Sequence, residues 1–343
     1  MGHHHPIQST IVVPQQSVRL PLLSSGGSHL NNRHMTSLPP NTETETESAT
    51  IPVLRREDWF DADGFPINVQ RRDPQEPFGI HCHDFCEIVI VTGGSGLHIT
   101  GKDAWELSPG DAFVIGGSRP HDYVNMDQLR LINILFDPAS IDMQLYDLPS
   151  LPGYHALFHL EPAWRQRHQF ESRLRLTARD LTTTIGLVNQ LEGELKRRDK
   201  AFGFTATAIF MQLTAHLSRC YGNSEGSDSI SLLRLAETIT YIETHYADPL
   251  QLKDLISVSR MSRRSYLRAF RTATGRTPIA YLLKIRIAKA AELLRSTQMS
   301  VTEIAFEVGF SDSNYFSRQF RGIMGKTPSQ YRQTSMRIND HRS

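Results

Sequence analysis

Four polar side chains in the first half of the chain have types and a spacing suited to binding a small ligand. His81 and His83 flank Cys82, so an extended strand places both imidazoles on one face and the thiol on the other. Glu87 follows four residues after His83, and His121 comes later. Three imidazoles and one carboxylate suit Fe, Mn, Ni or Zn, and the same groups hydrogen-bond hydroxyl-rich ligands. We favour hydrogen bonds from these groups to a ligand or to one another and expect neither a metal ion nor a cofactor, with a metal site as the alternative.

A second set of candidate residues lies within an internal repeat. Leu252–Ile256 recurs as Val301–Ala305, 49 residues later, and Tyr266–Arg271 recurs as Phe316–Arg321, 50 residues later. The same offset of 50 relates Gly275 to Gly325, Thr277 to Thr327, Pro278 to Pro328 and Tyr281 to Tyr331. A unit that recurs with its cap and core positions intact is a duplicated supersecondary element.

The pattern within each copy predicts a helix-turn-helix. A short amphipathic helix leads to a turn, for which Gly309 is suited in the second copy, and Ser262 or Ser311 can cap the following helix. The helix predicted between the copies, from Pro278 to Ser296, has 19 residues and a length of about 28 Å. Two reading helices at that separation fit successive major-groove segments roughly 34 Å apart on one face of DNA.

In each copy, the exposed face of the second helix of the helix-turn-helix carries side chains of the types that recognise DNA bases. Arginine pairs with guanine, asparagine with adenine, and aspartate accepts from cytosine. A solvated helix face is the alternative, but residues 231–343 hold 18 Lys and Arg against nine Asp and Glu, which favours a polyanionic partner. The predicted DNA-binding residues are Arg263, Arg264, Leu267, Arg268, Asp312, Ser313, Asn314, Ser317 and Arg318.

The spacing of apolar residues predicts the strands that carry the ligand-binding residues and the helices that follow them. Short apolar runs at Ile88–Val91, Gly96–Thr100, Ala112–Ile115 and Leu129–Phe136, separated by turn residues, predict a sandwich or small β-barrel. Apolar residues at helical spacing then predict two helices, with a break at Gly203. Their stripes are Leu181, Ile185, Val188, Leu191 and Leu195, then Ala206, Phe210, Leu213, Leu217 and Cys220. This hairpin either caps the barrel or forms a dimer seam, and we favour the seam of a homodimer.

Composition sets the class of protein. The 343 residues are 39% hydrophobic and 21% charged, the three cysteines cannot form a disulfide framework, and no apolar run is long enough to span a membrane. We expect a cytoplasmic, multidomain α+β protein. The predicted divisions are a disordered tail at 1–50, a barrel at 51–160, the hairpin at 161–221, a linker at 222–229 and an all-α DNA-binding domain at 230–335.

The repeat resembles the DNA-binding domain of the AraC/XylS family of bacterial transcriptional regulators. The resemblance covers about residues 230–335 and is carried by MSRRSYLRAFRTATGRTPIAYLLKIRIAKAAELL and MSVTEIAFEVGFSDSNYFSRQFRGIMGKTPSQYR. It implies seven helices, two helix-turn-helix motifs joined by a long helix, an effector-binding barrel ahead of them, and RNA polymerase as a partner. Two positions depart from the family pattern: Ile256 replaces the usual alanine, and Arg260 stands where the turn often has glycine.

The barrel segment carries two further resemblances. The spacing from His81 through Glu87 to His121 is similar to the metal-binding motif of cupins, which implies a cupin-like barrel. HDFCEIVIV, GSGLH and GDAFVIGGSRPHDY resemble activators of rhamnose-utilisation operons and imply a small sugar such as L-rhamnose as effector. The expected function is sequence-specific, sugar-responsive activation of transcription without enzymatic activity. The alternatives are a cupin-type metalloenzyme fused to a DNA-binding domain, or a repressor with a non-sugar effector.

Overall fold

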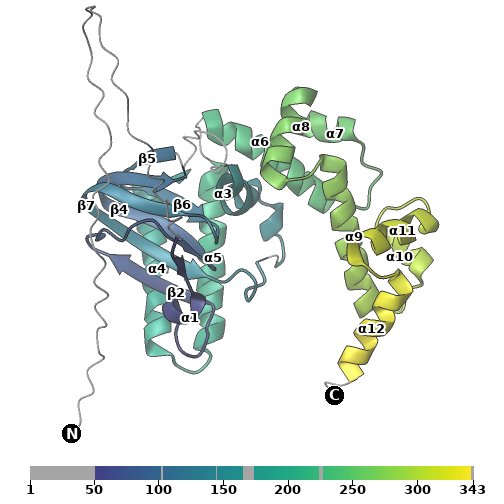
Figure 1. Cartoon of the computed structure of the whole chain (residues 1–343), viewed down its shortest axis with the longest axis horizontal. Coiled ribbons are helices and arrows are strands. Elements are labelled where there is room, and N and C mark those ends of the chain that lie inside the picture. Colours follow the sequence, from purple (N-terminus) through teal and green to yellow (C-terminus); the bar gives the residue numbers. More distant parts are fainter. Residues whose placement is uncertain (1–50, 102, 144, 165–173, 224–226, 341–343) are drawn as a thin grey trace, which may run out of the picture. The chain divides into compact units, whose positions relative to one another are not determined.

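The computed structural model describes residues 51–101, 103–143, 145–164, 174–223 and 227–340 (Figure 1). The predicted tail at residues 1–50 lies outside these ranges. The described residues form a sheet-rich N-terminal domain and a helical C-terminal domain, as the sequence predicts. Among them no helix combines the length and the apolar character that crossing a bilayer requires.

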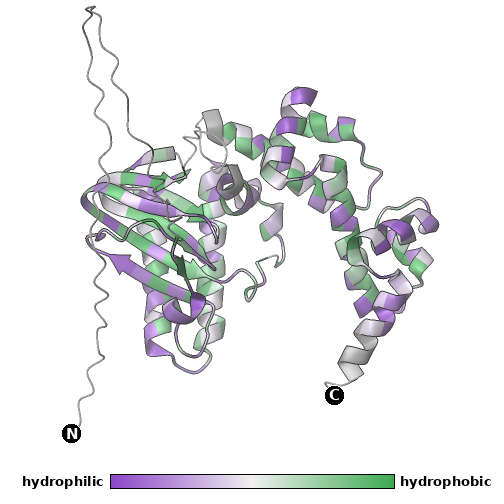
Figure 2. Ribbon diagram, viewed as in Figure 1, coloured by the Kyte–Doolittle hydropathy of each residue, from purple (hydrophilic) through white to green (hydrophobic). Residues whose placement is uncertain are grey.

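A six-stranded sheet dominates the N-terminal domain, with strand order β2-β7-β4-β6-β8 and β5 paired with β4, every pair antiparallel. Its strands are β2 (Ile67–Arg72), β4 (Cys86–Thr100), β5 (Asp103–Leu107), β6 (Asp111–Ile115), β7 (His121–Phe136) and β8 (Leu174–Arg175). A separate parallel pair joins β1 (Val53–Leu54) to β3 (Cys82–His83), near the short helix α1 (Arg56–Trp59). Figure 2 shows mainly apolar residues along the central strands, whereas β2 ends in polar ones.

Gly93 and Gly94, which separate the predicted strand runs Ile88–Val91 and Gly96–Thr100, lie inside β4. This strand is continuous from Cys86 to Thr100, and its register against β7 shifts at Gly93 and again near Ser95. Gly94 has φ of +69°, and a Cβ there would lie 2.0 Å from the carbonyl oxygen of Gln128. Glycine therefore permits a bulge where β7 approaches closely, and the strand bends without ending.

Two helices form the predicted hairpin, α4 (Ala178–Arg197) and α5 (Phe202–Gly222). The break lies at residues 198–201, where Arg198 and Ala201 have positive φ, whereas Gly203 is inside α5. Val188, Leu191 and Leu195 pack in the same apolar core as the sheet residues, with exposed fractions of 0%, 0% and 9%. These three side chains therefore stabilise the chain's own core and cannot contact a second subunit.

A short helical segment that precedes β8 packs against the helical domain. It comprises η1 (Leu148–Ser150), α2 (Pro152–Tyr154), the π-helix η2 (His155–Leu160) and α3 (Glu161–Trp164). The Nε2 atom of His155 lies 3.5 Å from a carboxylate oxygen of Glu243, and the Tyr281 hydroxyl donates to the same carboxylate at 2.9 Å. Three elements that are distant in sequence therefore meet at Glu243.

The C-terminal domain has seven helices within residues 227–340, as the family resemblance implies. They are α6 (Ser227–Thr244), α7 (Leu252–Ser259), α8 (Arg263–Thr274), α9 (Pro278–Ser296), α10 (Val301–Glu307), α11 (Ser313–Met324) and α12 (Pro328–Asp340). The bridging helix α9 has the predicted bounds, and it contributes Leu282 to one apolar cluster and Ile287 to another. Of the predicted linker at 222–229, Gly222 ends α5, Ser227 begins α6, and residues 224–226 lie outside the described ranges.

Caps define both helix-turn-helix motifs. The Ser262 side chain accepts from the amide of Ser265 and begins α8, as predicted. In the second copy the cap is Asp312, which accepts from the amide of Tyr315 at 2.6 Å, so the prediction of Ser311 was wrong by one residue. Aspartate caps a helix as well as serine does and also favours the positive end of the helix dipole.

The turn of each motif contains a residue with positive φ, although the two residues differ in type. Gly309 has φ of +87°, and Arg260, 49 residues earlier, has φ of +51°. A Cβ at Gly309 would lie 2.5 Å from the carbonyl oxygen of Ala247. Arg260 therefore takes the left-handed conformation that glycine adopts more readily, whereas Gly309 also meets a steric limit.

We predict that Gly309→Ala destabilises the C-terminal domain by about 1 kcal/mol or more, because it adds a backbone clash to a positive φ. Gly322→Ala is the matched control. Gly322 lies inside α11 with no atom within 4 Å of an added Cβ, so that change is expected to stabilise by about 0.5–1 kcal/mol. Urea denaturation of the full chain measures both, and effects of the same sign and size would contradict this account.

Candidate effector pocket and DNA interface

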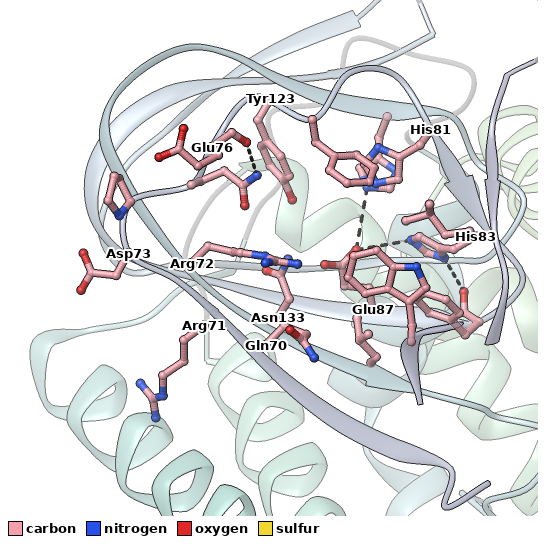
Figure 3. A pocket seen from close by; sticks show the side chains of 18 residues that line it. Gln70, Arg71, Arg72, Asp73, Glu76, His81, His83, Glu87, Tyr123 and Asn133 are labelled. Carbon is pink, nitrogen blue, oxygen red and sulfur yellow. Dashed lines mark hydrogen bonds and ion pairs between the residues drawn. The ribbon is translucent and has the colours of Figure 1, made fainter. Parts of the chain in front are cut away.

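All four predicted ligand-binding residues line one cavity of about 300 Å³ in the sheet-rich domain (Figure 3). His83 ends β3, Glu87 is the second residue of β4, and His121 begins β7. His81 reaches the same place because its backbone pairs with that of His121. Strand pairing thus brings together residues that are up to 40 positions apart in the sequence.

Backbone carbonyls fix the orientation of the three imidazoles. The Nδ1 atom of each ring contacts a carbonyl oxygen two residues away: His81 with Gly79 at 2.8 Å, His83 with Phe85 at 2.6 Å, and His121 with Arg119 at 3.2 Å. A carbonyl oxygen only accepts hydrogen bonds, so each Nδ1 carries the proton. In a neutral imidazole the Nε2 atom is then an unprotonated acceptor.

The Nε2 atoms of His83 and His121 converge on Glu87. Their distances to its Oε2 atom are 3.3 Å and 3.8 Å, and all three side chains are buried. Apart from this contact with Glu87, the Nε2 atom of His83 has no hydrogen-bond partner. The buried Oδ1 atom of Asn133, which also lines the cavity, has none either. Buried polar atoms are normally paired, so these two are suited to bind a ligand.

The surroundings of Glu87 favour an ionised carboxylate at the centre of the pocket. Burial raises the pKa of Glu87, but the neighbouring rings of His83, His121 and His81 outweigh it and hold that pKa below its usual range. Burial lowers the pKa of His121 to about 4, despite the opposing charge of Glu87. At neutral pH the centre of the pocket therefore presents the negative charge of Glu87 beside the neutral ring of His121.

Sequence reasoning missed the opposite wall of the cavity. It comes from β2 and the segment after it, with Gln70, Arg72 and Gln75 supplying polar groups. Figure 3 shows the Arg72 side chain directed into the cavity and that of Arg71 directed away from it. The Arg72 guanidinium also lies 5.7 Å from the centre of the Trp59 ring. The polar alternation along β2 was the available signal, but it matches no motif.

The two recognition helices place most of the predicted DNA-binding residues at the surface. Arg263, Arg264, Arg268, Asn314 and Arg318 are exposed. The other four have structural contacts: Leu267 packs partly against the core, Asp312 caps α11, and the Ser317 hydroxyl donates to the carbonyl of Ser313. The exposed residues keep the spacing of the repeat, since Arg264 corresponds to Asn314 and Arg268 to Arg318.

A second cluster of metal-ligand types lies in the hairpin. Asp180 on α4 and His216 and Cys220 on α5 have potential ligand atoms within 4.8 Å of one another. Burial, followed by the charge and hydrogen bond of Asp180, raises the pKa of Cys220 to about 11. The thiol is therefore protonated at neutral pH when no metal is bound. The sequence analysis did not identify this cluster, although His216 and Cys220 are four residues apart on one helix.

Comparisons with known proteins agree with this two-part architecture. Residues 69–198 match the AraC-like ligand binding domain, and residues 255–334 match a helix-turn-helix domain. The HTH-type transcriptional activator RhaR of Enterobacter sp. (strain 638) is 31% identical over 284 residues, which cover 82% of this chain and 97% of that protein. RhaR of Mannheimia succiniciproducens is 30% identical over 282 residues, with the same coverage.

The chain belongs to the AraC family of transcriptional regulators. Among solved structures, the DNA-binding domain of AdpA in complex with a target DNA is 32% identical, covers 29% of this chain and 91% of that one, and has a TM-score of 0.29. In this AraC-family regulator the ligand-binding match contains His81, His83, Glu87 and His121. The helix-turn-helix match contains both recognition helices.

We predict that acid destabilises the regulator between about pH 6.5 and 4. Burial lowers the pKa values of His121 and His155 to about 4, whereas an unfolded histidine titrates near 6.5. In this window the unfolded chain binds more protons, so the free energy of unfolding falls as the pH falls. Urea midpoints measured at pH 7, 5.5 and 4.5 test this, and His155→Asn is expected to reduce the slope. A midpoint independent of pH would contradict the burial of neutral imidazoles.

Proposed function

We propose that this regulator is a sugar-responsive transcriptional activator whose effector is a small sugar such as L-rhamnose. The observation that carries the proposal is the pocket itself, in which oriented imidazoles and a carboxylate converge in a chain that also has two DNA-reading helices. The similarity to proteins named as RhaR activators over 82% of the chain supports both the activator role and the effector class.

The chemistry of the pocket favours a polyhydroxylated ligand. Hydroxyl groups both donate and accept, so they can pair with Nε2 of His83, with the unpartnered Oδ1 of Asn133 and with the donor Arg72. Trp59 and Phe78 add an aromatic wall, with ring centres 6.2 Å apart. A cavity of about 300 Å³ lies at the lower end of the usual range for small-molecule sites, which favours a ligand of monosaccharide size.

The recognition helices are proposed to read two successive major-groove segments. On α8, the exposed Arg263, Arg264 and Arg268 are placed to contact guanine or phosphate. On α11, the exposed Asn314 is placed to contact adenine, and Arg318 to contact guanine or phosphate. The predicted roles of Leu267, Asp312, Ser313 and Ser317 remain part of the proposal, as contacts beside those made by these five side chains. The 19 residues of α9 set the separation of the two helices.

The proposed assembly is a cytoplasmic homodimer that contacts RNA polymerase at its promoters. Because Val188, Leu191 and Leu195 pack internally, a seam on the hairpin would use its outer surface. Phe204 on α5 is 80% exposed and is the largest apolar side chain available there. A change at Phe204 therefore tests dimer formation without disturbing the core.

We predict that Arg268→Ala and Asn314→Ala each cost about 1–3 kcal/mol at particular base pairs, in different halves of the site. Arg179→Ala is the control, since Arg179 is an exposed arginine of the effector-binding domain. Binding of the full chain to a set of single-base operator variants measures the effect. Equal weakening on every sequence would identify phosphate contacts and contradict base readout.

Arg71 and Arg72 are neighbours on β2 that point in opposite directions, so they form a matched pair for testing the effector site. Arg72→Ala and Glu87→Ala are expected to abolish induction by L-rhamnose in a reporter assay, because both side chains face the cavity. Arg71→Ala is expected to retain induction, because that side chain points away from the cavity and pairs with Glu192 at 2.9 Å. Uninduced DNA binding stays the same in all three. Full induction in Arg72→Ala and Glu87→Ala would remove this pocket from the mechanism.

A further inference from the structure

The hairpin brings three side chains of metal-ligating types together, away from the strand pocket. Asp180 lies in the first turn of α4, and His216 and Cys220 lie near the end of α5. Two helices joined by a short loop run antiparallel, so the start of α4 lies beside the end of α5. The imidazole and the thiol are four residues apart and share one face of α5. One potential ligand atom from each residue lies within 4.8 Å of the other two.

The separation of the imidazole and the thiol fits two ligands of one ion. The Sγ atom of Cys220 lies 3.7 Å from the Nε2 atom of His216. A sulfur about 2.3 Å and a nitrogen about 2.0–2.1 Å from the same zinc ion are about 3.5 Å apart at the tetrahedral angle. A small movement of either side chain therefore brings both atoms to coordination distance.

The carboxylate is oriented by its own helix. The hydroxyl of Thr177, which caps α4, donates to the Oδ2 atom of Asp180 at 2.6 Å. Carboxylates that ligate metals are themselves held by hydrogen bonds of this kind, which fix the direction of the ligand oxygen. Asp180, His216 and Cys220 are each partly buried, so the site has protein on one side and access to solvent on the other.

Protons occupy the centre of the cluster in the metal-free chain. The Nε2 atom of His216 lies 3.3 Å from the carbonyl oxygen of Asp180, which only accepts, so Nε2 carries a proton there. The Cys220 thiol hydrogen-bonds to the Asp180 carboxylate. A divalent ion at this point replaces both protons. The thiol proton passes to solvent and the imidazole proton moves to Nδ1, which leaves a thiolate and an unprotonated Nε2 as ligands.

We propose that Asp180, His216 and Cys220 bind one zinc ion, which joins the first turn of α4 to the end of α5. A thiolate, an imidazole and a carboxylate are the ligand types that zinc takes in proteins, and a thiolate disfavours Mg²⁺ and Ca²⁺. Three protein ligands leave the fourth position to water. Gly222 ends α5 and Ser227 begins α6, so the ion would stabilise the hairpin just before the chain enters the DNA-binding domain.

A hydrogen-bonded cluster without metal is the competing explanation. The contacts among Thr177, Asp180, His216 and Cys220 would by themselves join the two helix ends. Only a bound ion, however, makes the sulfur of Cys220 a metal ligand. The strand pocket is a second place where metal could bind, but its cluster of potential ligands contains no cysteine. A measurement specific for sulfur ligands therefore separates all three cases.

The test titrates Co²⁺, a spectroscopic substitute for zinc, into the full chain after chelation of metal and reduction with a phosphine. A cobalt–thiolate bond gives a charge-transfer band in the near ultraviolet, which nitrogen and oxygen ligands do not give. We expect this band in the parent chain and in Cys86→Ser, the matched control, because Cys86 is a partly buried free cysteine outside the cluster. We expect no band with Cys220→Ser, and at least tenfold weaker Co²⁺ binding at this site with Asp180→Asn.

Zinc content and thermal stability provide a second reading. After dialysis against zinc, elemental analysis is expected to find one ion fewer per chain in Cys220→Ser than in Cys86→Ser. Added zinc is expected to raise the midpoint of thermal unfolding more in Cys86→Ser than in Cys220→Ser, because an ion that binds only the folded chain stabilises it. Urea unfolding without metal verifies that both variants fold. A parent chain without the band, a band that persists in Cys220→Ser, or equal zinc content in the two variants would overturn the site.

Discussion

The pairing of ring Nδ1 atoms with backbone carbonyls is the constraint on which the pocket depends. Each of the three histidines uses a carbonyl two residues away, so the chain near the ring sets the ring's direction. These local contacts converge only because β3, β4 and β7 bring the backbones together, through the His81–His121 bridge and the pairing of β4 with β7. The result is a preorganised set of acceptors around Glu87, which a ligand can meet without first ordering the side chains.

The DNA-binding half depends on a different constraint, the duplication of one capped helical unit. Ser262 and Asp312 begin the two recognition helices, and Gly275 and Gly325 end them with the same φ of +72°. Because α9 contributes to an apolar cluster at each motif, it fixes their spacing. The segment at 148–164 contacts this half through His155, whose Nε2 atom lies 3.5 Å from a carboxylate oxygen of Glu243 on α6.

Local signals in the sequence were enough to predict the helical half and the four pocket residues. Repeat spacing, cap residues and the bounds of α9 are properties of neighbouring residues, and the H-x-H-x3-E spacing is local too. Features set by tertiary contacts were not predicted. Gly93 and Gly94 mark a bulge because β7 packs against them, and Val188 is buried because the hairpin covers the chain's own sheet. Arg72 joins the pocket through the pairing of β2 with β7, which has no sequence signature.

The central claim is that His83 and His121 present unprotonated Nε2 atoms to the ligand. The most direct measurement is the ¹⁵N–¹H correlation spectrum of histidine side chains in the full chain at pH 7, assigned with single-histidine variants. This account predicts the Nδ1-protonated tautomer for both residues, with resonances that shift when L-rhamnose is added. The Nε2-protonated tautomer, an imidazolium at pH 7, or resonances unchanged at saturating sugar would contradict it.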